Sequence, residues 1–261
     1  MNQTRTEQEV DPVVTEIVRN GVLAVTEEMK TNLMRTAYNM IIYEALDFTV
    51  GLFTAEGETV SIGLGLPMFI RGMSETIKAK LAHFGPDGIE PGDIMVTNDA
   101  YITGSHLNHV TFSLPIFHEG RLVAFSCCMA HWLDIGGVLG GMTTDIYSEG
   151  LQIPIVKYRK AGVINQDLVD IISMNVRLPP RAMGDLRAQI TAVTTGERRF
   201  LELLESREVL LADGATGTNL FNMGLQSGDA PELWNTDEPE KIKALYKGSV
   251  DAGSDLFLTN S

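Results

Sequence analysis

Hydrophobic residues recur at helical spacing in the first part of the chain. After a polar and charged arm, Pro12 begins a run in which apolar side chains return every three or four positions, while Glu27 and Glu28 lie on another face. This spacing predicts one long amphipathic helix from Pro12 to about Tyr38, and a second helix is predicted over 73–84. The apolar positions of the first run are Val14, Ile17, Val18, Val22, Val25, Met29 and Leu33.

Short runs rich in β-branched and aromatic residues lie between turn residues and predict strands. The first two runs flank a turn and predict a hairpin, and the last two predict another hairpin around a turn centred on Glu119 and Gly120. This mixture of hairpins and helices predicts an α+β fold for the N-terminal domain. The predicted strands cover 48–53, 60–62, 94–97, 110–117 and 122–129.

Three of the five histidines, His106, His109 and His131, bracket the second hairpin. A two-residue loop would set His131 opposite Asn108, with His106 on the same face, whereas a three-residue loop would set it opposite His109. In either register two or three imidazoles converge, and imidazole with carboxylate is a ligand set for zinc, manganese or iron. Separate polar residues at strand ends are the alternative interpretation.

Four carboxylates near these histidines are candidates for chemistry. Glu44 and Asp47 lie among apolar residues, either on the exposed face of a helix end or as buried groups that need a cationic or metal partner. Asp99 follows a predicted buried strand, and Asp134 stands three residues after His131, which it could orient. We take Asp47, Asp99 and Asp134 as candidate catalytic residues, although each alone fits a structural role better.

Composition narrows the class of protein further. The 261 residues include 34 acidic and 20 basic ones, for a net charge of −14, which argues against nucleic acid or an anionic membrane as partner. The chain has no apolar stretch of membrane-spanning length and no apolar leader, so we expect a soluble, cytoplasmic protein. Adjacent Cys127 and Cys128 provide no disulfide framework, which fits a reducing compartment.

Several short motifs follow one another between residues 11 and 205. They are Asp11-Pro12, Arg35-Thr36-Ala37-Tyr38, Leu46-Asp47-Phe48, Pro91-Gly92-Asp93, Asn98-Asp99-Ala100-Tyr101, His106-Leu107, Asp134-Ile135-Gly136-Gly137, Glu149-Gly150-Leu151 and Gly184-Asp185-Leu186-Arg187-Ala188-Gln189. In order and spacing this part of the chain resembles the hydantoinase B/oxoprolinase family. The resemblance implies hydrolysis of a small cyclic amide such as a hydantoin or 5-oxoproline, or carboxylation of a ketone such as acetone. It also implies a hydantoinase A-type partner subunit that binds ATP and phosphorylates the substrate's carbonyl or amide oxygen.

The resemblance also implies a metal site. In metal-binding members a glutamate, two histidines and an aspartate hold the ion, and the motifs place these ligands at Glu44, His106, His131 and position 109. His109 stands where those members have aspartate, which removes one negative charge and disfavours manganese relative to zinc or iron. The expected cofactors are a divalent metal, which would activate water or polarise a carbonyl, and ATP through the partner subunit.

A different pattern begins at Val209. It predicts a strand, a glycine loop, a helix that Pro239 begins and that ends near Ala252, and a second strand, which is a βαβ unit. This segment resembles the start of a homocysteine S-methyltransferase, whose fold is a (β/α)8 barrel. The resemblance implies that Asp213 and Gly214 bind the amino acid substrate. Because the zinc-binding cysteines of that family have no counterpart in the sequence, we expect neither that zinc nor methyl transfer.

Two truncated domains are therefore expected, a hydantoinase B/oxoprolinase-like portion over 1–206 and a methyltransferase-like fragment over 207–261. A lone βαβ unit leaves strand edges uncovered, and a full barrel takes about 250 residues, so the pattern indicates a chimeric chain joined near 203–208. Three functions stay open: a cyclic-amide hydrolase subunit, with ketone carboxylation as its variant, an inactive methyltransferase fragment, and a chain without activity.

Overall fold

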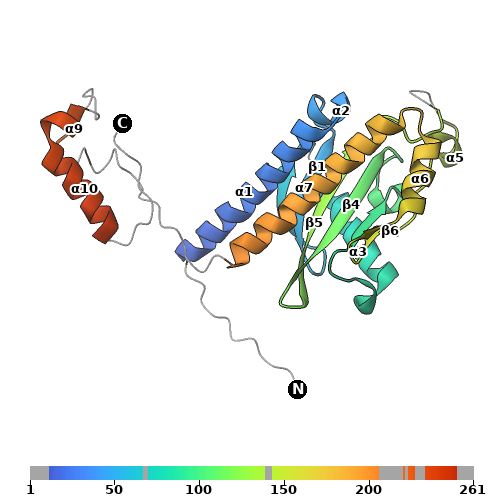
Figure 1. The fold of residues 1–261 in the computed structure, drawn as a ribbon, viewed down its shortest axis with the longest axis horizontal. Helices are drawn as coiled ribbons and strands as arrows, with labels where there is room; N and C mark the ends of the chain where they lie inside the picture. Colours follow the sequence, from blue (N-terminus) through green and yellow to red (C-terminus); the bar gives the residue numbers. More distant parts are fainter. Residues whose placement is uncertain are drawn as a thin grey trace, which may run out of the picture. The chain divides into compact units, whose positions relative to one another are not determined.

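A computed structural model gives the arrangement of the chain. It divides into two compact units, Met1–Glu205 and Ser206–Ser261. The first unit is a mixed α+β fold, as predicted, and the structure shows that it is built on one antiparallel sheet with helices on both faces (Figure 1). The residues that the structure describes are 12–66, 70–138, 143–205, 220, 223–226 and 233–251.

The sheet has seven strands in the order β2-β1-β5-β4-β3-β6-β7, and all neighbouring strands are antiparallel. Both predicted hairpins, β1 with β2 and β4 with β5, are confirmed, and β5 lies between β1 and β4 at the centre of the sheet. The strands are β1 Phe48–Thr54, β2 Thr59–Leu64, β3 Ile94–Thr97, β4 His109–His118, β5 Arg121–His131, β6 Val156–Lys160 and β7 Val163–Ile164.

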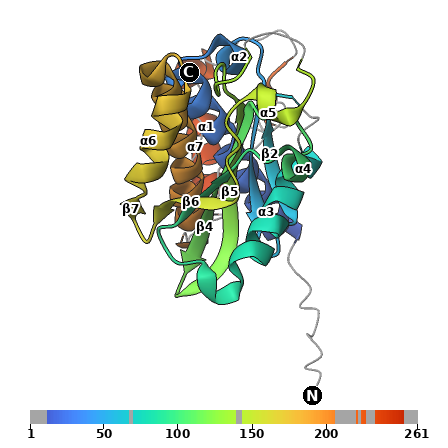
Figure 2. The ribbon, with the colours of Figure 1, turned by 90° about the vertical axis from the view of Figure 1, so that its right-hand side faces the viewer.

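Two long helices cover one face of the sheet and a shorter helix covers the other (Figures 1 and 2). Helices α1 (Pro12–Thr36) and α7 (Pro179–Glu205) lie side by side over the first face, and α3 (Ile70–Phe84) packs on the second. The predicted helices at α1 and α3 are confirmed. No helix in the described part of the chain is long and apolar enough to cross a membrane. Shorter helices are α2 Met40–Tyr43, η2 Pro86–Gly88, α4 Ala100–Thr103, α5 Ile146–Glu149 and α6 Gln166–Asn175.

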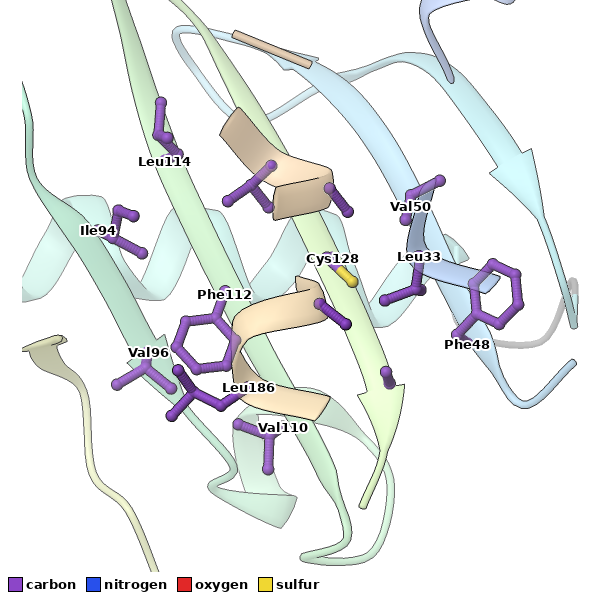
Figure 3. Close-up of a cluster of buried hydrophobic side chains, with 14 of the residues drawn as sticks. Leu33, Phe48, Val50, Ile94, Val96, Val110, Phe112, Leu114, Cys128 and Leu186 are labelled. Carbon is purple, nitrogen blue, oxygen red and sulfur yellow. The ribbon is translucent and has the colours of Figure 1, made fainter. Parts of the chain in front are cut away.

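Side chains of the inner strands β1, β3, β4 and β5 alternate between two apolar clusters, one on each face of the sheet. Cys128 packs in the cluster under α1 and α7, while Cys127 packs in the cluster under α3, so the adjacent thiols point in opposite directions. Both are free and buried, and burial raises the pKa of Cys127 to about 11 and of Cys128 to about 12. Figure 3 shows part of the first cluster, with Leu33 and Leu186 contributed by the helices and Phe112 by β4.

The described residues of the second unit form helices. The helix predicted to begin at Pro239 is confirmed as α10, Pro239–Asp251, and α9 spans Trp234–Asp237. They pack on a small cluster of their own around Leu220 and Ile242. The expected barrel fragment is not shown, because a βαβ unit requires two paired strands and the residues of this unit that the structure describes contain none. Both predicted strands lie outside the described residues.

Lys80 of α3 is fully buried against the sheet. Its Nζ donates to the backbone oxygen of Thr111 at 3.1 Å and to Ser113 Oγ at 2.9 Å. Within the described part of the chain no carboxylate forms an ion pair with it. Burial therefore lowers the pKa of Lys80 to about 7.

Replacing Lys80 tests whether burial lowers the pKa of its amine. Between about pH 7 and 8.5 the lysine is neutral in the folded protein but protonated in the unfolded chain, because its unfolded pKa is 10.5. The unfolded chain then binds the extra proton, so stability rises with pH by up to about 1.4 kcal/mol per unit. Lys80→Met should lose this slope, and Lys78→Met, on the same helix, should keep it. Urea unfolding across this pH range measures both, and an unchanged slope in Lys80→Met would contradict the assignment.

Candidate functional site

The turn between β4 and β5 sets the register of the histidines. Glu119 and Gly120 form a two-residue loop with φ values of 50° and 75°, as a type I′ turn requires. This loop alone would have placed Asn108 opposite His131. The predicted two-residue loop is thus confirmed. The register that this loop length implied, with Asn108 opposite His131, is not observed.

A β-bulge changes the register by one residue. Ile116 pairs with Ala124 but Phe117 pairs with Leu122, so Val123 is an extra residue on β5. From the bulge onward the pairing is shifted, and His109 lies directly opposite His131. Residues opposite each other in an antiparallel pair share one face of the sheet, so both imidazoles lie on the same side.

The sequence predicts that two or three imidazoles converge, and the structure brings all three together. Ring centroids are 4.4 Å apart for His106 and His109, 5.1 Å for His106 and His131, and 5.2 Å for His109 and His131. Burial lowers the pKa of His109, and burial together with the neighbouring His109 lowers the pKa of His131 to about 4. Both rings are therefore neutral near pH 7, and each has a nitrogen lone pair that can accept a proton or bind a cation.

Asp47 comes to this cluster through a local turn. Leu46 has a φ of 58°, a conformation that L-residues rarely adopt, and the chain turns there from α2 into β1. The backbone oxygen of Asp47 accepts from the His131 N–H at 3.1 Å, and its Oδ1 lies 3.0 Å from Nε2 of His109. Of the two environments considered for this carboxylate, the structure shows the largely buried and paired one.

His109 is bonded at both ring nitrogens. Its Nε2 contacts Asp47, and its Nδ1 lies 2.8 Å from Oγ of Ser105. The ring is buried, with 2% of its side chain exposed. To bind a metal ion, as the sequence predicts, His109 would have to give up one of these hydrogen bonds. By contrast, Nδ1 of His131 is buried without a hydrogen-bond partner.

Two polar residues of α7 hold neighbouring segments in place: Gln189 bonds at the ends of the strands that carry the histidines, and Asp185 bonds to the segment before α2. Gln189 is fully buried, donates from Nε2 to the backbone oxygen of Val110 at 2.9 Å and accepts from Trp132 Nε1 at 2.7 Å. Asp185 accepts two backbone N–H groups just before α2, from Tyr38 and Asn39, at 2.7 and 3.1 Å. The sequence marked both only as part of a motif. Two polar residues four apart on one face of α7 were the signal for this role.

Pockets of about 630 and 550 Å³ adjoin at this end of the sheet. The first is lined by His106, His131 and also Glu149, which the sequence marked only as part of a motif. The second is mainly apolar and is lined by Glu44, which is exposed. Both share Ile41 as a wall residue, so Glu44 lies next to the histidine pocket without lining it.

The remaining candidates are placed elsewhere or in structural roles. Asp99 caps the N-terminus of α4 by accepting from the Tyr101 N–H at 3.0 Å. Asp134 lines the apolar pocket, pairs with Arg177 at 2.8 Å and accepts from the Gly136 N–H, and in the described part of the chain it makes no hydrogen bond to His131. The predicted substrate-binding residues Asp213 and Gly214 lie outside the described residues.

The described side chains of the histidine cluster do not form a complete metal site. Among the residues that the structure describes, no three His, Cys, Asp or Glu side chains are arranged to hold a metal ion. His106 and His131 remain close enough to share a ligand, and Nδ1 of His131 needs one. The arrangement can therefore position a small polar group between these two imidazoles.

The family model named hydantoinase B/oxoprolinase matches residues 11–234. The chain therefore belongs to the hydantoinase B/oxoprolinase family. Its match extends over 207–234, which the sequence pattern attributed to a methyltransferase-like part, and these findings give that attribution no support.

Solved and curated relatives agree with this family. The crystal structure of ATP-dependent caprolactamase from Pseudomonas jessenii has a TM-score of 0.72 and 31% identity, covering 77% of this chain and 35% of that one. Caprolactamase subunit beta of that organism is 34% identical over 200 residues, 75% of this chain and 34% of the relative. A 5-oxoprolinase of Saccharomyces cerevisiae is 29% identical over 256 residues, 94% of this chain and 19% of the relative. The chain thus spans about a third of the caprolactamase subunit.

Removing the carboxylate of Asp47 tests its pairing with His109. Asp47→Ala leaves a buried ring nitrogen without its acceptor and should destabilise the protein by about 1–3 kcal/mol. Asp47→Asn keeps an oxygen that accepts from Nε2 and should lose less. The free energy of unfolding in urea gives both values. Equal losses in the two variants would mean that the hydrogen bond does not contribute.

Proposed function

We propose that the chain is the portion of a hydantoinase B/oxoprolinase-type subunit that carries the reaction centre for ATP-coupled hydrolysis of a cyclic amide such as a hydantoin or 5-oxoproline. The convergence of His106, His109 and His131 beside two pockets is the observation that carries this proposal. The names of its relatives, an ATP-dependent caprolactamase and a 5-oxoprolinase, support it. The proposal includes a separate ATP-binding subunit of the hydantoinase A type.

A divalent metal ion is part of this proposal. The buried and unpartnered Nδ1 of His131 fits such an ion, and the adjacent His106 provides a second imidazole. Glu44, beside their pocket, would provide a carboxylate, so we propose His106, His131 and Glu44 as the ligands. Zinc, iron or manganese bound there would polarise the substrate carbonyl or lower the pKa of a bound water.

The chain's own residues would bind and orient the substrate. The apolar pocket, with Tyr43, Trp132 and Leu133 among its walls, suits the hydrocarbon part of a lactam or hydantoin ring. Leu133 also borders the histidine pocket, so a ring in the apolar pocket would direct its polar amide toward His106 and His131. Asp47 holds His109 in place behind them.

Metal analysis of purified protein tests the ligands. His106→Ala and His131→Ala should each lose at least about tenfold in metal affinity, because two imidazoles provide much of the proposed ligand set. His83→Ala is the matched control, since His83 is exposed on α3 and should leave the metal content unchanged. Elemental analysis of all four proteins after equal metal exposure is the measurement. Metal content that is the same in all of them would refute the site.

Substrate turnover tests the reaction itself. With an A-type subunit and ATP, a hydantoin or 5-oxoproline should be opened, with ADP released in proportion, and His131→Ala should remove the opening. Mass spectrometry of the product distinguishes ring opening from ketone carboxylation, which would consume bicarbonate with acetone. Carboxylation alone would replace the hydrolase assignment.

A further inference from the structure

Ser105, His109 and Asp47 form one continuous chain of hydrogen bonds. Oγ of Ser105 lies 2.8 Å from Nδ1 of His109, and Nε2 of the same ring lies 3.0 Å from Oδ1 of Asp47. These separations are those of a nucleophile, a general base and a carboxylate that orients the base. We propose that Ser105 is a nucleophile for acyl transfer, with His109 as its base and Asp47 as the orienting group.

The carboxylate determines which ring nitrogen can act as the base. The carboxylate of Asp47 is the acceptor in its contact with His109, so the ring places a proton on Nε2 and donates it to Oδ1. The lone pair then lies on Nδ1, which faces the hydroxyl of Ser105. A hydroxyl that donates to a neutral imidazole is the arrangement from which a serine is activated. Compared with chymotrypsin, Nδ1 and Nε2 of the histidine exchange roles. The serine, histidine and aspartate would otherwise act in the same way.

The hydroxyl of Ser105 has access to its own pocket. Ser105 is partly exposed and lines a cavity of about 360 Å³, together with Arg71, Gly72 and Thr103. His106 and His131 line the histidine pocket but do not line this cavity. The triad therefore opens on a different side of the histidine cluster. A cavity of this size suits a small acyl group.

Arg71 lines the same cavity and would stabilise negative charge on the substrate. In the part of the chain that the structure describes, the guanidinium of Arg71 forms no ion pair, even though Glu75 lines the same pocket. Because Arg71 lines the same cavity as Ser105, its guanidinium would provide a positive charge for an oxyanion that develops on an attacked carbonyl. We therefore assign small carboxylic esters, or other activated acyl compounds with a good leaving group, as the substrate class.

The reaction balances without any cofactor. Oγ of Ser105 bonds to the acyl carbon while its proton passes to Nδ1 of His109, and the leaving alcohol departs with that proton. Water then attacks the acyl-serine and gives its proton to Nδ1. The carbon–Oγ bond breaks, Ser105 recovers the proton, and the carboxylic acid is released.

This activity goes beyond the proposed cyclic-amide hydrolysis and uses a different pocket. The metal-binding family members that this sequence resembles have an aspartate at the position of His109. An aspartate there could not act as a general base between Ser105 and Asp47. The triad therefore depends on a residue in which this chain departs from that pattern.

A covalent probe tests the nucleophile directly. Incubating the full chain with a small alkyl fluorophosphonate, in the presence of EDTA, should phosphonylate one serine, and peptide mass spectrometry should locate it at Ser105. Ser105→Ala should lose the label. Ser148→Ala is the matched control, because Ser148 is also a partly exposed serine but bonds within α5, and it should be labelled as the wild type is.

Two further measurements separate a catalytic serine from a merely accessible one. Asp47→Asn should slow labelling by at least tenfold, since it removes the charge that orients His109. Hydrolysis of p-nitrophenyl acetate should fall in parallel in Ser105→Ala and Asp47→Asn while circular dichroism shows the same fold. Absence of label at Ser105, or equal labelling rates in wild type and Asp47→Asn, would overturn the proposal. Because EDTA is present, either result is independent of metal content in the proposed hydrolase site.

Discussion

The antiparallel pairing of β4 with β5 is the constraint on which the candidate site depends. A two-residue turn at Glu119 and Gly120 closes the hairpin, and the extra Val123 moves its far end by one position. Without that bulge Asn108 would face His131, and the side chain of His109 would lie on the other face of the sheet. The hydrogen bonds that the His109 ring forms with Ser105 and Asp47 depend on this register.

Buried polar contacts then fix this end of the sheet against the helices. Gln189 of α7 bonds to β4 and to Trp132 just beyond β5, and Asp185 holds the turn before α2. Burial by these layers also keeps His109 and His131 uncharged, because an apolar surrounding disfavours the imidazolium. Packing and site chemistry thus have the same origin, since the residues that close the core also determine the protonation of the histidines.

Two kinds of chemistry share this histidine cluster. His106 and His131 line the histidine pocket, and Nδ1 of His131 is buried without a hydrogen-bond partner, which suits the ligand role proposed for a hydantoinase B/oxoprolinase-type subunit. His109 faces away from it, toward Ser105, and its hydrogen bonds suit a base. His109 could bind the metal ion only by breaking its hydrogen bond with Ser105 or with Asp47. The structure therefore favours a division of roles among the three imidazoles.

The sequence by itself determined the helices α1 and α3, both hairpins and the convergence of His106, His109 and His131, because amphipathic periodicity and turn residues are local signals. It left the register of His131 open, since a bulge leaves no mark in the hydrophobic pattern. It also gave no reason to connect Ser105 with Asp47, which are 58 positions apart, or to assign α7 to the site. Only tertiary structure decided these contacts, because they join the start of β4 to the residue before β1 and to α7, which are far apart in the sequence.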